Sequence, residues 1–494
     1  MTSNEVNDER TRAQRARDTR ARAWPRPVFL ATAAVYIALR FLAVVGTGAK
    51  SNFPDSRTYR HASGFPTYRL IDFAGHAVRP WAVPLFYRLL PSDNLRVDAQ
   101  VLVSVVAWLT LAGTVALVLR DNRVRIAAFV IVLALSCTTP VASWDRVILA
   151  ESLAISTAVF ALAAALRFVV KATWLNAAAF IGAMTFFTFT KVTMFPVIAL
   201  AAVFVGLLAL AKEKRQLRII TAIVLAAVAA WGAVTTSRVE KAYAAVDNTG
   251  ASGFALDFAY ELRMNILNDP VELSWFVTHG MPDPIGLVGY ARTSPIDDGW
   301  ATWNAFFDAY RARPDMASWV EAKGRGVFTR YVLTHPWQTT SDFVHDLPYM
   351  LAPPRSAIVY DDDPRQVLPS VVESMLFDAA PTPAPASYGD VGLLAAVSIA
   401  LILIARRRGI DRSLLLLAGA LFVFAAVGIA IGWTVVPIEI ARHAIPQSVL
   451  IRLALWIAVF VSVDALLSAR PSTREHRTVE TAVVTNPDPE PPGA

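Results

Sequence analysis

The chain alternates between long apolar stretches and shorter polar ones, a pattern typical of a helical membrane protein. Several apolar stretches approach the roughly 20 residues with which an α-helix crosses a bilayer, although some are shorter. We predict an all-α, polytopic transmembrane fold with about ten spans. The predicted spans are 28–48, 97–119, 126–141, 146–168, 174–190, 193–211, 218–236, 391–405, 413–433 and 446–467.

The loops between these spans predict the orientation of the chain. Loops on the cytoplasmic side of membrane proteins are enriched in Lys and Arg. With the Arg-rich segment 1–27 inside, every predicted inner loop is basic, namely 120–125, 167–173, 212–218, 406–412 and the tail from Arg470. We therefore predict that both termini are cytoplasmic in a bacterial plasma membrane. Segment 1–27 reads as a disordered basic arm and 468–494 as a disordered tail. A secretory signal is disfavoured, because the first apolar run is long and lacks a clear cleavage site.

Two predicted outer segments are too long to be simple connectors. The first, 49–96, follows the first span and belongs to an N-terminal transmembrane module, 28–236. The second, 237–390, contains the amphipathic stretches "ELRMNILNDPVELSWFVTHGMPD" and "FTRYVLTHPWQTTSDFVHDLPYML", in which Pro marks helix starts or turns. We predict a mostly helical outer insertion lying on the bilayer face, followed by C-terminal membrane helices in 391–467.

Composition supports a membrane protein and changes the interpretation of its charge. The 494 residues are 55% hydrophobic and 17% charged, with a formal net charge of +7. The mean hydropathy is +0.45 and the pI about 9.6. In a soluble protein this charge would suggest nucleic acid, but here the excess lies in short loops and favours lipid headgroups as partner. Cys137 is the only cysteine, so no intramolecular disulfide forms.

Charged residues inside the predicted spans are few, and such residues are functional candidates by default. Arg40, Glu151 and Arg452 each lie five to eight residues from the predicted outer end of a span, about 8–12 Å below the surface. This depth suits a lipid headgroup better than an ion path at the midplane. The alternative is that the two arginines extend to the headgroups. Glu151 needs a buried partner, which we expect to be Arg40 or Arg452.

The outer loops add further polar candidates. The stretch "PDSRTY" after the first span contains Asp55, Arg57 and Tyr59. An Asp after Pro is often a helix N-cap or turn residue, which is the alternative to a functional role. In "SWDRVILAESLAIS", Arg146 and Glu151 are roughly aligned on a helix. A buried ion pair without chemistry is the alternative there.

Basic side chains recur at the same predicted face. Lys191 lies in the short link between two spans, and "VPIEIARHAIP" contributes Glu439, Arg442 and His443, with Arg452 below them. Guanidinium groups make bidentate, permanently charged contacts with phosphate. A membrane-surface anchor is the alternative for Lys191.

Metal and nucleotide chemistry have little support. The acidic run "YDDDPRQ", 360–366, is able to offer oxygens to a divalent cation, but a solvated loop is the alternative. No His/Cys cluster has metal-ligand spacing, and no phosphate-binding glycine loop is present. We assign no metal site and leave a divalent cation open.

Seven stretches together resemble the GT-C superfamily of membrane glycosyltransferases. They are "FPDSRTY", "RPWAVPLFYRLL", "RVILAESLAIS", "FFTFTKVTMFPVIAL", "ILNDPVELSWFVTHGMP", "VLTHPWQTT" and "EIARHAIPQSVLIRLAL". The resemblance covers most of 28–467 and is carried by architecture and order more than by any one motif. Many family members have two acids in the first outer loop, whereas Ser56 follows Asp55 here.

The resemblance implies inverting transfer of a sugar from a polyprenyl-phosphate donor to a glycan, lipid or protein acceptor of the cell envelope. By position, Asp55 is the implied general base. The implied donor-phosphate ligands are Lys191, Arg442, His443 and Arg452. The supporting polar cluster comprises Arg40, Arg57, Tyr59, Arg146, Glu151 and Glu439.

Two other functions stay open at this point. One is a transporter or flippase of lipid-linked glycans, which would move such a lipid without forming a glycosidic bond. The other is a non-catalytic envelope assembly protein on the same scaffold, which would tolerate substitution of Asp55 and Glu151.

Overall fold

A computed structural model gives the fold of the chain. It describes residues 26–44, 46–51, 54–60, 79–210, 213–246, 253–292, 300–352, 365–377, 389–406, 410–435 and 440–468. Over these residues the secondary structure is helical, without a β-strand and with one isolated bridge between Lys50 and Val147. The predicted all-α polytopic class is confirmed. The predicted terminal arm and tail lie almost wholly outside the described residues.

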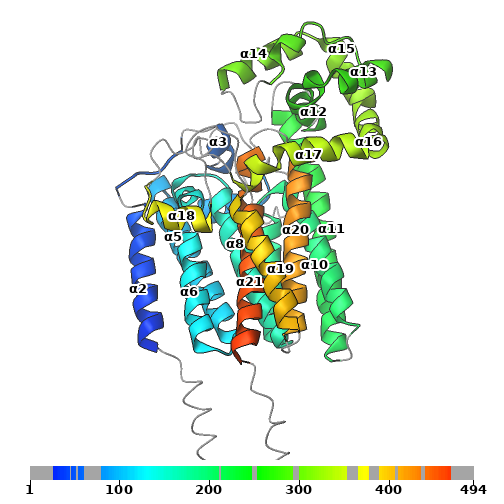
Figure 1. Ribbon diagram of the computed structural model, residues 1–494. Helices are drawn as coiled ribbons and strands as arrows, with labels where there is room; N and C mark the ends of the chain where they lie inside the picture. Colours follow the sequence, from blue (N-terminus) through cyan, green and yellow to red (C-terminus); the bar gives the residue numbers. More distant parts are fainter. Residues whose placement is uncertain are drawn as a thin grey trace, which may run out of the picture.

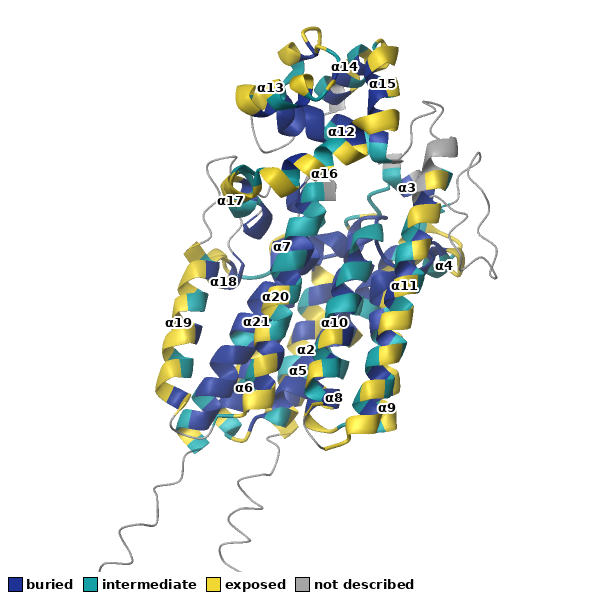
Figure 2. Cartoon of the chain, turned by 90° about the vertical axis from the view of Figure 1, so that its right-hand side faces the viewer, coloured by how far each residue is buried: buried dark blue, intermediate teal, exposed yellow. Residues whose placement is uncertain are grey.

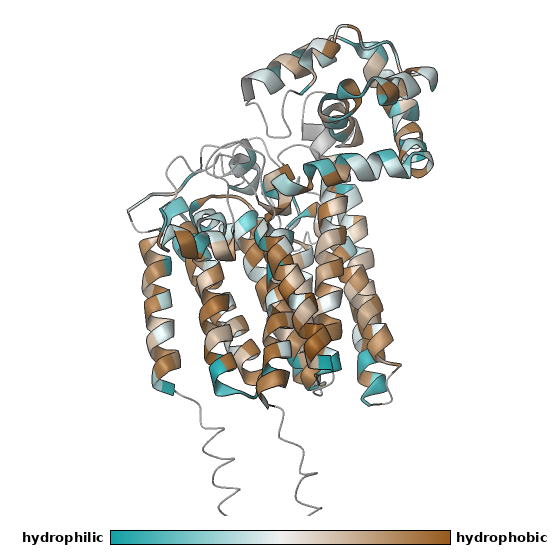
Figure 3. Ribbon diagram, in the orientation of Figure 1, coloured by the Kyte–Doolittle hydropathy of each residue, from teal (hydrophilic) through white to brown (hydrophobic). Residues whose placement is uncertain are grey.

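Each predicted span overlaps one of ten longer helices, and these helices form a bundle (Figure 1). They are α2 (Arg26–Leu42), α5 (Asp93–Val118), α6 (Asn122–Ser136), α8 (Glu151–Val170), α9 (Trp174–Thr188), α10 (Phe195–Leu208), α11 (Arg215–Val246), α19 (Gly389–Ala405), α20 (Arg412–Val435) and α21 (Ile440–Ser468). Hydrophobic residues dominate the bundle, and hydrophilic ones gather at its two ends (Figure 3). We call these the upper and lower ends, as seen in Figure 1.

The predicted number of crossings is not reached. Among the described residues, five helices are long and apolar enough to cross a membrane: α5, α8, α11, α20 and α21. The count rises to six if α6 and the bent segment after it form one span. The reason is helix length: α10 has 14 residues and rises about 21 Å, short of a hydrocarbon core of about 30 Å. Length and composition thus support five or six crossings rather than ten.

Helix α21 is the most deeply buried of these five helices and packs against α8, α19 and α20. Its dark-blue segments lie within the bundle in Figure 2. Near its lower end, a carboxylate oxygen of Asp464 accepts hydrogen bonds from the backbone N–H groups of Arg120 and Asp121, at 2.8 and 2.7 Å. Asp121 in turn caps α6 through its own side chain. These bonds satisfy donors that a helix start leaves open and fix α21 against the turn between α5 and α6.

Short helices cross the upper end of the bundle. They are α3 (Pro54–Arg60), α4 (Ala82–Arg88), α7 (Thr139–Ala142) and η1 (Ser143–Arg146). The segment Thr139–Arg146 bends by 60° from α6. The side chain of Arg60 holds α3 against the start of α5, with Nη1 at 2.8 Å from Asp93 and Nη2 donating to the carbonyl of Ser51 at 2.6 Å. The segment before α3 therefore runs across the bundle rather than away from it.

A second hydrophobic core lies above the bundle, in residues 253–334, which we call the upper unit. Its helices are α12 (Gly253–Met264), α13 (Pro270–Thr278), α14 (Trp300–Arg311), α15 (Pro314–Trp319) and α16 (Arg325–Thr334), with η3 (Ile266–Asn268), η4 (Val288–Tyr290) and the π-helical η5 (Val320–Gly324) between them. Phe258, Phe276 and Trp303 are buried in this core. Aromatic side chains supply much of the buried surface of this small unit.

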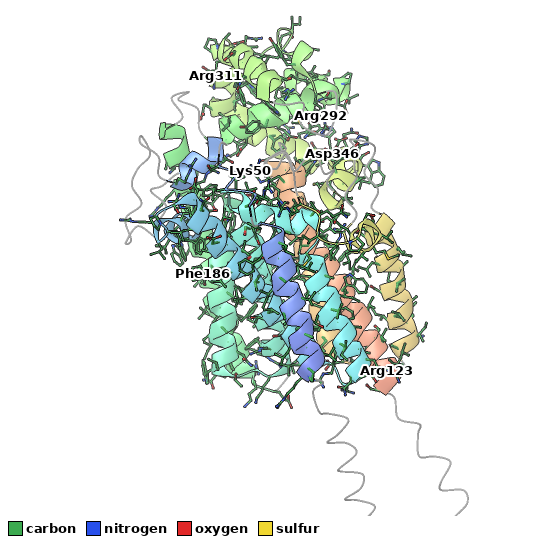
Figure 4. All side chains as sticks on the ribbon, turned by 90° about the vertical axis from the view of Figure 1, so that its left-hand side faces the viewer. Lys50, Arg123, Phe186, Arg292, Arg311 and Asp346 are labelled. Carbon is green, nitrogen blue, oxygen red and sulfur yellow. The ribbon has the colours of Figure 1, made fainter. Side chains whose placement is uncertain are left out.

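Helix α17 (Pro336–Leu351) connects the upper unit to the bundle, and α18 (Ser370–Leu376) precedes α19. Asp346 of α17 accepts from both terminal nitrogens of Arg292, at 3.2 and 3.3 Å, and from the indole N–H of Trp433 on α20, at 3.0 Å. Arg292 and Asp346 are labelled at this junction in Figure 4. Helix α11 runs without a break across the boundary predicted after residue 236.

Candidate active site

Asp55 lies in the first turn of α3, and both of its carboxylate oxygens contact arginines. Its Oδ1 accepts from Nη2 of Arg79 at 2.5 Å. Its Oδ2 accepts from Nη2 and Nη1 of Arg442 at 3.3 and 3.4 Å. The side chain keeps an exposed fraction of 31%. The carboxylate is therefore engaged by guanidinium groups from two distant segments and remains open to an incoming molecule.

Arg442 also connects Asp55 to a second carboxylate. Glu151 begins α8 and is buried. Its Oε1 accepts from Nζ of Lys191 at 2.8 Å and lies 3.7 Å from Nε of Arg442. The expected partners of Glu151, Arg40 and Arg452, were wrong. Because α8 begins at Glu151, this side chain faces the upper end, where Lys191 and Arg442 lie.

These contacts define an upper cluster of three cations and two carboxylates: Arg79, Lys191, Arg442, Asp55 and Glu151. Its formal charge is +1. A site with surplus positive charge attracts anions, and guanidinium and ammonium groups are the usual protein ligands of phosphate.

Three neighbours lie beside the upper cluster, namely His443, Thr58 and Tyr59. Nε2 of His443 lies 3.3 Å from Nη2 of Arg442. Arg79 is fixed by Thr58, whose hydroxyl oxygen accepts from Nε at 2.8 Å, and its guanidinium lies 5.0 Å from the ring centroid of Tyr59. Burial raises the pKa of Tyr59 to about 12, so its phenol keeps its proton at neutral pH.

Arg79 was missed by the sequence reasoning. It opens the stretch "RPWAVPLFYRLL" in the first outer loop, and the only signal there was an arginine next to Pro80 in a segment already considered functional. Its role depends on α3, because Asp55, Thr58 and Tyr59 all contact its guanidinium.

Neighbouring charges and burial shift the pKa of Asp55 in opposite directions. Burial alone raises the pKa of this carboxyl, but the charges and hydrogen bonds of Arg79 and Arg442 outweigh it and lower the pKa below its ordinary value. Asp55 is therefore a carboxylate throughout the neutral range in this arrangement.

Arg452, expected to bind phosphate, lies in a different ion pair. Its Nε and Nη2 donate to Oδ2 of Asp390 at 3.0 and 2.6 Å, and Nη1 donates to the hydroxyl of Ser448 at 2.6 Å. Its guanidinium lies 3.8 Å from the ring centroid of Phe377. Ten residues separate it from Arg442, about 15 Å along the helix.

Arg40 also lies apart from the upper cluster. It pairs with Asp145, donates to the hydroxyl of Ser104 at 2.6 Å and donates to the carbonyl of Ser136. Ser152 donates to the other oxygen of Asp145 at 2.7 Å. Arg40 thus joins α2, α5, α6 and η1 inside the bundle.

The remaining predicted residues are Arg146, Arg57 and Glu439. Arg146 is buried in η1, and its carbonyl accepts from the backbone N–H of Lys50 at 2.9 Å. Arg57 belongs to α3, but its side chain lies outside the described residues, as does the whole of Glu439.

The positions of the intramembrane charges relative to the helix ends differ from those predicted. Arg40 lies two residues from the end of α2, Glu151 begins α8, and Arg452 lies twelve residues inside α21, where five to eight were expected. Apolar composition alone does not locate helix ends to within a turn.

An apolar groove runs down the side of the bundle. It is a cavity of about 480 Å³ between α4, α5, α8 and α9, and Phe186, labelled in Figure 4, lines it. Its upper part is lined by Ala82, Leu153 and Thr190, close in sequence to the cluster residues Arg79, Glu151 and Lys191. Arg167 and Asn176 line its lower part. From Leu153 to Arg167 the groove follows α8 for about 21 Å.

Metal-ligating side chains do not gather in the part of the chain that the structure describes. No group of three His, Cys, Asp or Glu residues there is arranged to hold a metal ion. Of the acidic run 360–366, residues 360–364 lie outside the described residues.

Comparison with known proteins gives a structural likeness but no sequence match. No protein-family profile and no curated protein matches the chain. Among solved structures, it is similar to the archaeal oligosaccharyltransferase AglB from Archaeoglobus fulgidus, in complex with an inhibitory peptide and a dolichol-phosphate. The identity is 14% and the TM-score 0.39, over 93% of this chain and 52% of the other. The chain thus spans about half the length of that protein.

Proposed function

We propose that this protein is a membrane glycosyltransferase of the GT-C type, which transfers a sugar from a polyprenyl-phosphate donor to a glycan, lipid or protein acceptor of the cell envelope. One observation carries the proposal. A part-exposed carboxylate and three cations lie together at the upper end of the bundle, and an apolar groove runs down from residues close in sequence to Glu151 and Lys191. Transfer from a lipid-linked sugar phosphate requires a base for the acceptor, cations for the donor phosphate and an apolar surface for the lipid chain.

The cations suit the donor phosphate. In the transfer, the bond between the anomeric carbon and the phosphate oxygen breaks, and its electron pair leaves with the polyprenyl phosphate. Fixed positive groups stabilise the charge that develops on this leaving group. Lys191 and Arg442 are the proposed ligands, with His443 beside them, and Glu151 orients both cations through its Oε1.

Asp55 suits the role of general base. A sugar hydroxyl is a weak nucleophile, and a carboxylate within hydrogen-bond reach accepts its proton as the oxygen attacks the anomeric carbon. No covalent enzyme intermediate is needed, so the anomeric configuration inverts. Among the carboxylates of the upper cluster, Asp55 is the more exposed, at 31% against 3% for Glu151.

The groove suits the lipid part of the donor. Its lining is mostly apolar, with Phe86, Phe160 and several alanines, and it runs down from residues close in sequence to Glu151 and Lys191. An isoprenoid chain in the groove would leave its headgroup at the upper end.

Positive charge at the lower end of the bundle supports the proposed orientation. Arg120, Arg123, Lys171, Arg215 and Arg218 lie at the lower end, next to the ends of α5, α8 and α11. Positively charged loops favour the cytoplasmic side. We therefore propose that the upper cluster faces the extracytoplasmic side of a bacterial plasma membrane.

The test is a transfer assay with the full chain in proteoliposomes, using a panel of polyprenyl-phosphate sugars and glycan acceptors. Mannose and arabinofuranose are the first two sugars of the panel. The proposal predicts a new glycosidic bond, released polyprenyl phosphate, and a loss of about 100-fold or more in Asp55→Asn. Asp98→Asn, an exposed carboxylate on α5, is the control and should keep full activity.

Two other outcomes would replace the proposal. Movement of a labelled lipid-linked sugar across sealed vesicles, without a glycosidic bond, would identify a flippase. An absence of both transfer and movement, with full function in cells after Asp55→Asn and Glu151→Gln, would identify an assembly protein.

A further inference from the structure

The two arginines on Asp55 are held in different ways. Arg79 makes the short contact, 2.5 Å to Oδ1, and is itself anchored to α3 by Thr58 and by the ring of Tyr59. Arg442 makes the long contacts, 3.3 and 3.4 Å to Oδ2. Arg79 therefore belongs structurally to α3, whereas Arg442 reaches Asp55 from α21.

Arg442 lies between two carboxylates, and its contacts with Asp55 are the longer of the two arginine contacts on that residue. Its Nε lies 3.7 Å from Oε1 of Glu151, while Nη1 and Nη2 point to Asp55. Rotation about the side-chain torsions of Arg442 would carry Nη1 and Nη2 together from Asp55 to another anion, because the guanidinium donors form a fixed fork. A donor phosphate beside Lys191 would offer such an anion.

The resting arrangement conflicts with the task of a base. A general base works best when its pKa is close to the operating pH, but two arginines lower the pKa of Asp55. Removing one of them raises that pKa, because one attractive charge is lost. The same step uncovers one carboxylate oxygen for an acceptor hydroxyl.

We propose that Arg79 is a positioning residue that holds Asp55 by Oδ1, and that Arg442 covers Oδ2 until a donor phosphate draws it away. Donor binding thus prepares the base, and an acceptor hydroxyl finds Oδ2 only after the donor is in place. This order disfavours proton abstraction in the empty site. The inference rests on the proposed function, because it assigns Arg442 to the donor phosphate.

Competition for Arg442 gives a test that does not depend on transfer. The probe is a polyprenyl phosphate without sugar, and its affinity for the full chain in nanodiscs is measured by native mass spectrometry. Asp55→Asn removes the competing carboxylate charge and should tighten binding about fivefold or more. Lys191→Gln should weaken binding in the same assay.

Asp93→Asn is the matched control. Asp93 is also held by two arginines, Arg60 at 2.8 Å and Arg96 at 2.6 Å, and neither of them belongs to the upper cluster. The affinity of the Asp93→Asn variant for polyprenyl phosphate should stay unchanged. Unchanged or weaker binding in Asp55→Asn would overturn the inference and leave the proposed function standing. Tighter binding in Asp55→Asn, together with no sugar transfer by the wild type, would support competition for Arg442 and overturn the proposed function.

The role of Arg79 is tested by kinetics in the transfer assay. Arg79→Gln should lower kcat with little change in the KM for the donor, and should move the acidic limb of the kcat profile to higher pH. Arg79→Lys should restore part of kcat, because it returns the charge. A merely structural role would reduce the amount of folded protein without moving the pH limb. A large increase in donor KM with unchanged kcat would make Arg79 a phosphate ligand and overturn its assignment.

Discussion

Two groups of buried charge in this protein differ in balance and in access. The pair of Arg452 and Asp390 is one cation and one anion, with exposed fractions of 1% and 6%. The upper cluster has three cations for two carboxylates, and Asp55 keeps an exposed fraction of 31%. Both contain an arginine on α21 that the sequence marked for phosphate. Burial of an arginine therefore does not by itself point to a binding site, and the proposed function rests on the accessible carboxylate and the cations around it.

The physical reason lies in desolvation. Taking a charge out of water costs free energy, which a partner in good geometry offsets. Asp390 offsets this cost for Arg452 by accepting two hydrogen bonds. A phosphate would have to displace Asp390 to reach it. In the upper cluster, the proposed phosphate would lie beside cations that contact a part-exposed carboxylate.

The largest effect that tests the difference between the two groups is expected when Arg442 is neutralised. Arg442→Gln should reduce sugar transfer by about 100- to 1000-fold, the usual loss when a donor to developing charge is removed. The thermal midpoint of the detergent-solubilised protein should change little, because Lys191 still pairs with Glu151. Both are measured on one purified sample. Full activity in this variant would remove Arg442 from the site.

Arg452→Gln should show the opposite pattern. It leaves the Asp390 carboxylate buried without its charge partner, which costs about 3–5 kcal/mol of stability. The readout is the thermal midpoint, together with the transfer rate per folded molecule, which should stay near that of the wild type.

A paired variant controls for the loss of packing at Arg452. Asp390→Leu combined with Arg452→Met replaces both charges by apolar groups and should recover most of the stability. A stable but inactive Arg452→Gln protein would contradict the comparison, because it would make Arg452 functional.

The upper unit contains a third group of buried titratable side chains, and these are acidic. Glu261 and Glu272 are both buried there. Burial raises the pKa of Glu261 to about 7, and burial together with Glu261, Asp342 and Asp269 raises that of Glu272 to about 9. Between the ordinary pKa and these values, the folded protein keeps protons that the unfolded chain releases. The free energy of unfolding therefore falls as pH rises from about 4.5 to about 9.

Glu272→Gln sharpens this case. The amide carries no charge, so the variant should be more stable than the wild type at pH 8 to 9 and similar near pH 4, with a flatter dependence on pH. Thermal midpoints across that range measure the difference. Parallel curves for the two proteins would show that Glu272 does not titrate with a raised pKa.

The smallest expected effect concerns the groove. Ala179 lines it and Ala178 does not, although both are exposed on α9. Ala179→Phe should raise the KM for a long-chain donor by a few-fold, about 1 kcal/mol of lost apolar contact, and leave a short-chain donor unaffected. Ala178→Phe is the matched control. Equal effects of both variants on both donors would remove the groove from donor binding.

The sequence was informative about elements and much less about contacts. All ten apolar segments contain a helix, because hydrophobic length is a local property. The number of helices long enough to cross a bilayer was overestimated, since helix ends depend on packing and capping that apolar composition does not show.

For the candidate site, residue type and face were predictable, and partners were not. Asp55, Glu151, Lys191, Arg442 and His443 were all chosen from the sequence, and the structure brings them together. The contact of Asp55 with Arg442 spans 387 positions, and no periodicity predicts it. Arg40 and Arg452 were expected beside Glu151 because their partners, Asp145 and Asp390, cannot be recognised without the fold. Arg79 was missed for the same reason.

The most direct test of the central claim is an experimental density map of the full chain with a bound polyprenyl phosphate. The account predicts the phosphate within hydrogen-bond distance of Lys191 and Arg442, the lipid chain along the groove, and Oδ2 of Asp55 released while Oδ1 stays with Arg79. A phosphate bound away from Lys191 and Arg442, with both arginines still on Asp55, would contradict it.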